Sequence, residues 1–211
     1  MTRRDEAKQG EPTDVDGSFP HSDFPSQPLY RSHRWRPSSQ DGGCWSFHSL
    51  SGPGARGGRF DLPTPRGTCY WASTALSAAR ERLGRPGDLV AEDETDGVVV
   101  SRARVGRGVA ADLLDVDAAR RGAIAELSAT SDYSLCQRWA ASFAAAGFDG
   151  IRYQPRFSSD RAFALALFGD EGVPSLAPAV TDSVPVRDIW IAHGYTIVPT
   201  PRAEDLGPLL D

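Results

Sequence analysis

The clearest helical pattern in the chain lies in residues 134–146. Leu135, Trp139 and Phe143 are spaced four residues apart, so they lie on one side of a helix with 3.6 residues per turn. Ala146 follows three residues later and extends the same stripe. We therefore predict an amphipathic helix that packs its apolar side on the core.

A second helix is predicted from the residues at its ends. Ser73 or Thr74 has a side chain that can accept hydrogen bonds from the first N–H groups of a helix. Gly84, directly after Leu83, is a typical helix stop. A weaker helical pattern covers residues 117–127.

Strands are predicted where apolar residues alternate with polar ones or form short buried runs. The predicted strand segments are residues 29–31, 68–72, 97–105, 148–153, 163–168 and 189–198. Because many short strands are combined with few helices, we predict an α+β fold with short mixed or antiparallel sheets and a few flanking helices.

The ordered domain is expected to cover residues 29–198. Residues 1–28 are polar, rich in proline and aspartate, and nearly free of aliphatic side chains, so we predict a disordered N-terminal tail. Residues 199–211 are expected to form a C-terminal tail. Glycine, serine and proline in residues 37–58 predict a long loop, and Trp45 within it indicates that the loop folds back on the protein.

Composition favours a cytoplasmic protein. The chain has 211 residues, of which 40% are hydrophobic. It has no apolar run of the roughly 20 residues that span a bilayer and no secretory pattern at its start. Its three cysteines, Cys44, Cys69 and Cys136, are far apart and odd in number, which fits a reducing compartment better than a disulfide scaffold.

Positive charge is concentrated in one part of an acidic chain. The net charge is −5, but residues 29–85 contain nine arginines and only Asp41, Asp61 and Glu81 as acids. A guanidinium can hold a phosphate through two hydrogen bonds, so this block suits a compact anion. Direct nucleic-acid binding is not expected, because such domains are usually basic as a whole.

Several common catalytic motifs are absent from the sequence. It has no HExxH or CxxC spacing, so no metal site is predicted. It has no GxSxG elbow. Its one lysine, Lys8, is not in a phosphate-binding GxxxxGK[ST] loop, and its clustered glycines lack the GxGxxG spacing of dinucleotide-binding folds.

Four short segments instead carry the residues with chemical potential. Residues 29–34 (LYRSHR) place arginines on a predicted strand. Residues 57–61 (GGRFD) precede residues 67–73 (GTCYWAS), and a helix with Glu81 follows. Residues 147–153 (GFDGIRY) form a later strand, after which a serine-bearing loop begins.

The order and spacing of these segments, over about residues 29–198, resemble the RES domain family, named for a shared arginine, glutamate and serine. The resemblance implies a fold like that of the ADP-ribosyltransferase toxins. It also implies an NAD-degrading toxin of a bacterial toxin–antitoxin pair, with NAD as substrate rather than a bound cofactor. A helix-turn-helix antitoxin is the implied protein partner, and members of the family often form homo-oligomers.

Carried over to this chain, the family arginine corresponds to Arg31, the glutamate to Glu81 and the tyrosine beside nicotinamide to Tyr70. Arg59 matches the arginine of the GGRFD element. The family serine usually follows the strand tyrosine directly, where this chain has residues 154–156 (QPR).

A shifted loop would place Ser158 or Ser159 at the position of the family serine. Ser158 is therefore the candidate catalytic serine.

These residue types suit cleavage of the nicotinamide–ribose bond, which leaves an electron-poor sugar. Glu81 would stabilise the developing positive charge and orient or deprotonate the nucleophile. Arg31 would hold the pyrophosphate, and Tyr70 would stack on nicotinamide. Arg59 or Arg34 would bind inorganic phosphate as a co-substrate.

The same residues also have structural interpretations. On a helix, Glu81 projects away from the apolar stripe and could pair in solvent with Arg85, four residues later. Arg31 could be a surface arginine, and Tyr70 could be a core aromatic residue. Arg59 could only support its loop, and Ser158 could belong to a turn.

Three functions follow from these alternatives. The first is an NAD phosphorylase or glycohydrolase. The second is a mono-ADP-ribosyltransferase that modifies a protein or a small molecule, and the third is a non-catalytic NAD-binding module.

Overall fold

The computed structural model of the chain describes residues 8–13, 15–38, 43–50, 57–158 and 161–200. Its strands are β1 (His21–Asp23), β2 (Leu29–Arg34), β3 (Ser49–Leu50), β4 (Leu62–Pro63), β5 (Arg66–Ala72), β6 (Leu89–Ala91), β7 (Val98–Ala103), β8 (Val109–Asp112), β9 (Gly150–Tyr153), β10 (Ala164–Asp170), β11 (Val180–Pro185) and β12 (Thr196–Val198). Its helices are α1 (Ala75–Leu83), α2 (Glu126–Ala129), α3 (Tyr133–Ala145) and α4 (Val186–Ala192), with 3₁₀ turns η1 (Glu92–Glu94) and η2 (Ala118–Arg121).

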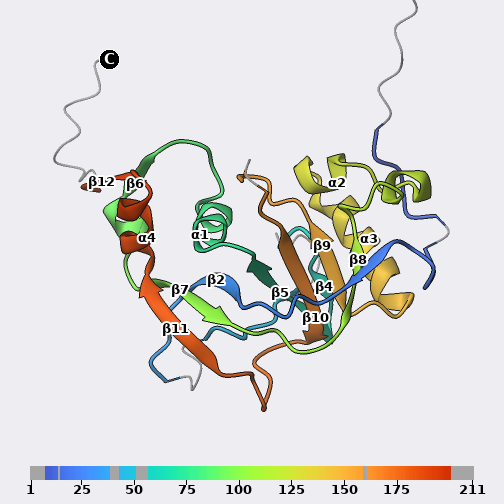
Figure 1. Cartoon of the computed structure of the whole chain (residues 1–211), viewed down its shortest axis with the longest axis horizontal. Helices are drawn as coiled ribbons and strands as arrows, with labels where there is room; N and C mark the ends of the chain where they lie inside the picture. The colour runs from blue at the N-terminus through green and yellow to red at the C-terminus, as the bar shows by residue number, and fades with distance from the viewer. Residues whose placement is uncertain (1–7, 14, 39–42, 51–56, 159–160, 201–211) are drawn as a thin grey trace, which may run out of the picture.

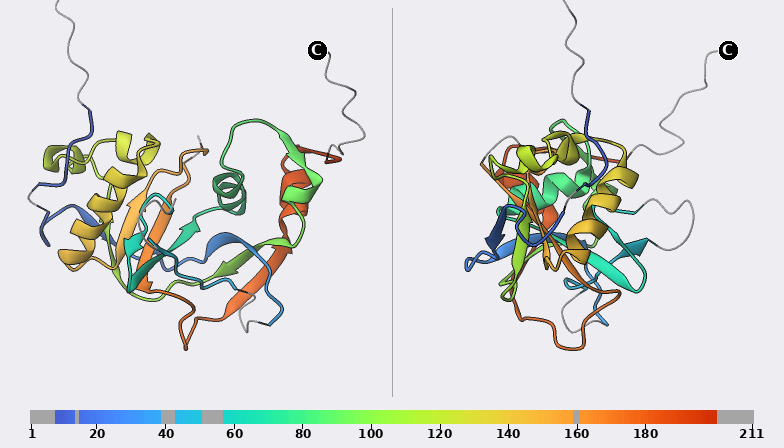
Figure 2. Two further views of the ribbon diagram at one scale, coloured as in Figure 1. Left: turned by 180° about the vertical axis from the view of Figure 1, so that it is seen from behind. Right: turned by 90° about the vertical axis from the view of Figure 1, so that its right-hand side faces the viewer.

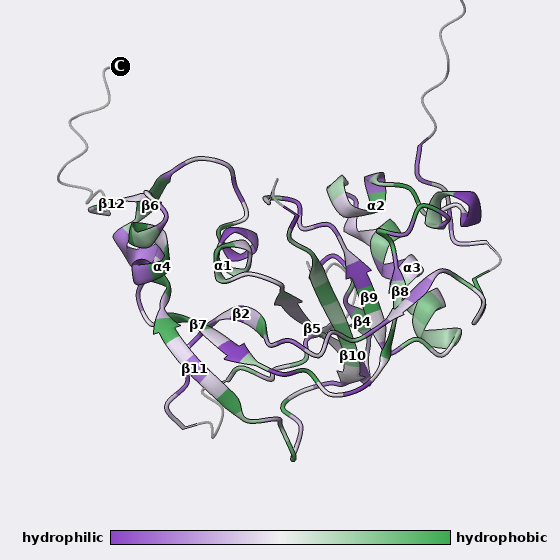
Figure 3. Ribbon diagram, viewed as in Figure 1, coloured by the Kyte–Doolittle hydropathy of each residue, from purple (hydrophilic) through white to green (hydrophobic). Residues whose placement is uncertain are grey.

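Within the described ranges, the main sheet has eight strands in the order β1-β8-β9-β10-β5-β2-β7-β11 (Figure 1). Neighbouring strands are antiparallel except β8 and β9, which are parallel. Two further sheets, β12-β6 and β3-β4, have two strands each. Strand β10 is buried from Ala164 to Phe168, and its green ribbon in Figure 3 shows that it is apolar. It pairs with β9 on one side and with β5 on the other.

The sheet divides into two parts between β5 and β2. Strand β10 pairs with β5 over seven residues, and β2 pairs with β7 over six. In contrast, β2 and β5 are joined through one residue pair, Tyr30 with Ala72. The two strands therefore separate beyond this pair, and Figures 1 and 2 show α1 above the division.

Each part of the sheet has its own core. Helix α3 covers the β8-β9-β10 part, where Trp139, Phe143 and Phe19 are fully buried. Helices α1 and α4 cover the β2-β7 part and pack around Val100 and Trp190. A third cluster, which includes Leu29 of β2, Trp71 of β5 and Leu165 of β10, crosses the division, so packing joins the two parts in addition to the single pair of β2 with β5.

Local sequence explains where α1 begins and ends. The Thr74 side chain accepts a hydrogen bond from Ser77 N at 3.1 Å, which caps the N-terminus. Gly84 ends the helix with a positive φ of 69°, a conformation that glycine adopts without the strain of a Cβ atom. The helix predicted between these residues is confirmed.

The loop predicted over residues 37–58 folds back on the protein in its described part. Trp45 is 3% exposed, and its ring lies 4.5 Å from the ring of Trp71, between centroids. Cys44 is buried in the same cluster. None of the helices in the described part of the chain is long and apolar enough to cross a membrane.

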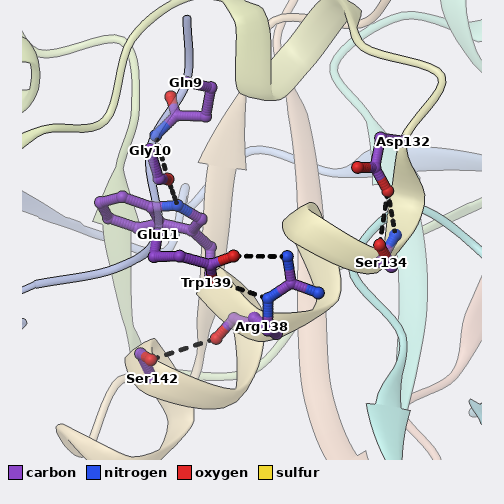
Figure 4. Close-up of polar contacts among 8 residues, drawn as sticks. All are labelled: Gln9, Gly10, Glu11, Asp132, Ser134, Arg138, Trp139 and Ser142. Atoms are coloured by element: carbon purple, nitrogen blue, oxygen red, sulfur yellow. Dashed lines mark hydrogen bonds and ion pairs between the residues drawn. The ribbon is translucent and has the colours of Figure 1, made fainter.

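The prediction that residues 1–28 are a disordered tail is wrong for the described part of this segment. Strand β1 pairs with β8, and Phe19 is fully buried against α3. Residues 8–13, which we call the N-terminal strap, lie along α3. Trp139 Nε1 donates to Gly10 O at 2.9 Å, and Arg138 forms an ion pair with Glu11 through two hydrogen bonds (Figure 4). These contacts hold the N-terminal segment in place, although its polar composition predicts disorder.

Two further element predictions are corrected. Residues 189–198, predicted as a strand, contain the end of α4 and then the short strand β12. Their apolar run is too short for periodicity to separate helix from strand. The helix predicted over residues 117–127 is replaced by η2, a turn at Gly122 and the beginning of α2.

Candidate active site

A cavity of about 400 Å³ opens where β2 and β5 separate. Its walls come from β2, β5, α1, β9, the loop 57–61 and the loop after β9. This volume lies within the range of about 300–1,000 Å³ that is usual for small-molecule sites. Four of the residues with a predicted site role line it, namely Arg31, Arg59, Tyr70 and Glu81.

Arg31 bridges the two strands at the division. Its guanidinium donates to the Sγ atom of Cys69 on β5 and, through Nη2, to Ser46 O at 2.9 Å. The side chain is 8% exposed, so the prediction that it could be a surface arginine is wrong. Both of these acceptors are neutral, and the guanidinium keeps further N–H groups for a ligand in the cavity.

Glu81 faces the cavity from α1. Its Oε1 accepts a hydrogen bond from Phe157 N at 2.8 Å. Burial raises the pKa of Glu81 above its usual value, whereas the Phe157 N–H group and the guanidinium of Arg59 act in the opposite direction. The solvated pair with Arg85 is not formed, because Arg85 Nη2 instead donates to Glu94 Oε2 at 2.7 Å.

Tyr70 contributes its ring to the cavity wall and its hydroxyl to the loop 57–61. The hydroxyl donates to Asp61 Oδ1 at 2.7 Å and accepts from Phe60 N at 2.8 Å. Asp61 in turn accepts from Gly58 N at 2.6 Å. A Cβ atom on Gly58 would lie 2.7 Å from the Tyr70 hydroxyl, so this loop needs glycine there. The tyrosine therefore acts as pocket wall and loop anchor together.

Arg59 lies opposite α1 and is held by backbone carbonyls. Its Nη1 donates to Leu127 O at 3.2 Å and to Thr130 O at 2.7 Å. Its guanidinium carbon lies 4.8 Å from the centre of the Tyr133 ring. Arg59 is 7% exposed, so it both supports its loop and presents a positive charge at the cavity.

The structure does not bring Ser158 or Arg34 into this cavity. Ser158 is 5% exposed, and its Oγ lies 2.8 Å from Ser77 Oγ of α1, behind the wall. This contact ties the loop after β9 to α1. Arg34 lines a neighbouring cavity of about 440 Å³. Ser159 lies outside the described residues.

Sequence reasoning missed several residues of the cavity wall. These are a second set of arginines and tyrosines: Arg82, Arg156, Tyr30, Tyr133 and Tyr153. Two of them had a usable signal, because Arg82 follows the candidate glutamate directly and Arg156 lies where the family serine is expected. The others are known as cavity residues only once β2, β9 and α3 are placed in space.

The arrangement combines one carboxylate with several guanidinium groups and aromatic rings. Guanidinium groups bind phosphates, and flat rings can stack on a heterocycle. A carboxylate in the same cavity can stabilise a developing positive charge. Among the described residues, no cluster of three His, Cys, Asp or Glu side chains could hold a metal ion.

Comparisons with known proteins give one family match and similar solved structures. The model of the RES domain matches residues 28–189. One similar solved structure is a chain of the M. tuberculosis MbcT–MbcA toxin–antitoxin complex, at a TM-score of 0.55 and 14% identity, over 80% of this chain and 89% of that chain. No curated protein matches the chain. The expected fold, an α+β arrangement of the ADP-ribosyltransferase type, is confirmed, and the chain belongs to the RES domain family.

Proposed function

We propose that this protein cleaves the bond between nicotinamide and ribose in NAD and transfers ADP-ribose to phosphate or water. The observation that carries the proposal is the convergence of Arg31, Tyr70 and Glu81 on one cavity. These residues come from β2, β5 and α1, and each supplies a group that the reaction needs. Membership of the RES domain family supports the same conclusion.

In the proposed reaction, the electron pair of the C–N bond leaves with nicotinamide, which departs neutral. The ribose carbon becomes oxocarbenium-like, and the carboxylate of Glu81 stabilises its positive charge. An oxygen of water or phosphate then bonds to this carbon, and any proton released passes through Glu81 to solvent. Arg31 holds the pyrophosphate, and the ring of Tyr70 stacks on nicotinamide.

The contacts around Glu81 fit this role. Its carboxylate is half-buried, and the Phe157 N–H group fixes one of its oxygens. A fixed charge in a cavity stabilises a transition state better than a mobile one, because no reorganisation is needed during the reaction. Arg59 and Arg156 lie close enough to favour the ionised form of Glu81, and they are the candidates for holding an anionic acceptor beside it.

The proposed biological role is that of a toxin acting in the cytoplasm, with a helix-turn-helix antitoxin as partner and without direct nucleic-acid binding. The similar structure is of a toxin–antitoxin complex, which supports this role. Binding of an antitoxin over the cavity would block NAD. Co-expression with the protein encoded by the neighbouring gene, followed by purification, tests whether a stable complex forms.

The activity is tested by incubating the purified protein with NAD, with and without inorganic phosphate, and separating the products. We expect nicotinamide in both samples or only with phosphate, and the sugar product identifies the acceptor. Glu81→Gln should lose activity, whereas Glu92→Gln, a change at an exposed glutamate, should keep it. Absence of nicotinamide release, or full activity in Glu81→Gln, would rule out the proposal.

A second candidate is a mono-ADP-ribosyltransferase. It is favoured by the position of Ser158 behind the cavity wall, which removes the hydroxyl expected from the family pattern. NAD labelled in the adenosine part separates the two candidates. Label that stays on a protein or small-molecule acceptor supports the transferase, and label found only in ADP-ribose or its phosphate supports the first proposal.

A further inference from the structure

Ser32 on β2 has a hydroxyl that the protein does not use. The residue lines the cavity and directly follows Arg31 on β2, two positions after Tyr30, which pairs with β5. Its Oγ atom is buried and makes no hydrogen bond with any described residue. Buried hydroxyl groups nearly always have a partner, so an unpaired one needs an explanation.

Arg82 on α1 lines the same cavity as Ser32. It lines both this cavity and the neighbouring one that contains Arg34. Within the described ranges it forms no ion pair or hydrogen bond, whereas Arg85, three residues later, pairs with Glu94. Burial lowers the pKa of Arg82, and the nearby guanidinium groups of Arg34 and Arg31 lower it further.

The charged side chains of the cavity wall have different neighbours. Glu81 lies near the guanidinium groups of Arg59 and Arg156, which favour its ionised form. Arg82 instead lies near the guanidinium groups of Arg34 and Arg31, and repulsion between these like charges raises the free energy of the empty site. An anion would relieve this repulsion and supply an acceptor for the unpaired hydroxyl.

We propose that Ser32 and Arg82, together with Arg31, form an anion subsite at the α1–β2 end of the cavity that binds a phosphate group. The serine hydroxyl has three staggered positions about its Cα–Cβ bond, and rotation carries it from the wall into the cavity. There it donates to a phosphate oxygen while Arg82 approaches from α1. The identity of the natural ligand rests on the proposed function, and it would be the NAD pyrophosphate or the phosphate co-substrate. The existence of an anion site does not depend on that function.

Calorimetric titration of the full chain with ADP, pyrophosphate and inorganic phosphate tests the subsite without any turnover. We expect Ser32→Ala to weaken binding by about fivefold and Arg82→Gln by about tenfold or more, since a hydrogen bond to a charged group is worth more than a neutral one. Tight binding of ADP and pyrophosphate identifies a nucleotide subsite. Tight binding of inorganic phosphate alone identifies a co-substrate site.

Two matched controls separate the subsite from general effects. Ser22 also has a buried hydroxyl without a partner among the described residues, but it does not line the cavity. Ser22→Ala should therefore bind all three anions normally. Arg80→Gln removes a charge from α1 at a residue that donates to the Tyr195 hydroxyl outside the cavity, and it should bind normally as well.

Thermal melting supplies a second readout. Loss of an unpaired hydroxyl breaks no bond, so Ser32→Ala should melt no lower than the unaltered protein when no anion is present.

Unchanged affinity in Ser32→Ala and Arg82→Gln, equal losses in the controls, or absence of binding to all three anions would each overturn the subsite. If Ser32→Ala weakens anion binding but the unaltered protein never cleaves NAD, the proposed function fails and the subsite stands. If NAD is cleaved, and Ser32→Ala changes neither anion binding nor the KM for NAD or for phosphate, the proposed function stands and the subsite fails.

Discussion

The two sides of the cavity differ in how far the protein satisfies its own polar groups. On the side of the loop 57–61 and α2, the hydroxyl of Tyr70, the carboxylate of Asp61 and the guanidinium of Arg59 all bond to backbone or side-chain partners. On the side of α1 and β2, Ser32 and Arg82 have no such partners in the described residues. The comparison suggests that the first side holds the fold and the second is kept for a ligand.

Arg31 belongs to both sides and should therefore give the largest effect. Arg31→Ala removes the donors to Cys69 and to Ser46 O and leaves these groups buried without them. We expect a loss of about 3 kcal/mol in the free energy of unfolding, together with loss of ADP binding. Urea unfolding and calorimetry measure the two effects. Normal stability with lost binding would assign Arg31 to the ligand side alone.

Asp61 tests the bonded side. Asp61→Ala removes the acceptor of the Tyr70 hydroxyl and of Gly58 N, and we expect about 2 kcal/mol less stability. The residue is 3% exposed, so water cannot easily replace the carboxylate. Asp115→Ala, at an exposed position, is the control. An Asp61→Ala protein as stable as the control would show that the loop is held by other contacts.

Ser158 gives a smaller effect of the same kind. Because its hydroxyl contacts Ser77 behind the wall, we expect Ser158→Ala to lower stability by about 1 kcal/mol and to leave the rate of NAD cleavage within about twofold. The measurements are urea unfolding and nicotinamide release. A loss of activity by a factor of about 100, the scale of a catalytic group, would return Ser158 to the catalytic set.

The smallest expected effect is a pH dependence at Glu81. Its pKa is raised by burial, so the folded protein holds the proton more tightly than the unfolded chain does, and the stability from that proton is lost as pH rises through the folded pKa. Glu81→Gln cannot ionise, so its melting temperature relative to the unaltered protein should rise between pH 4 and pH 8. A constant difference across this range would contradict the raised pKa.

Local signals were enough to predict the elements that frame the cavity. Thr74 and Gly84 mark the ends of α1, and the apolar stripe with Trp139 marks α3. The order of the polar segments pointed to Arg31, Tyr70 and Glu81, which do share a cavity.

Helix periodicity alone would have left Glu81 in solvent. It failed because the polar side of α1 faces the division of the sheet, a feature that no local pattern shows.

The missed features depend on contacts between distant parts of the chain. The subsite residues Ser32 and Arg82 lie about 50 positions apart in the sequence, and they line the same cavity because α1 packs on β2. The order of the N-terminal segment has the same origin, since Gln9 Nε2 donates to Gly122 O at 2.8 Å and Ile124 N donates to Gln9 Oε1 at 2.9 Å. Composition alone cannot predict such pairings.

The strap also changes what counts as the folding unit of this protein. Gln9 N donates to Glu126 Oε2 at 2.5 Å at the beginning of α2, and α2 supplies the Leu127 carbonyl that holds Arg59. The family match begins only at residue 28. A gene fragment cut at that boundary would encode every shared motif yet lack Phe19 and the clamp on α2. Boundaries for expression, fusion tags and crystallisation trials should therefore be set ahead of residue 8.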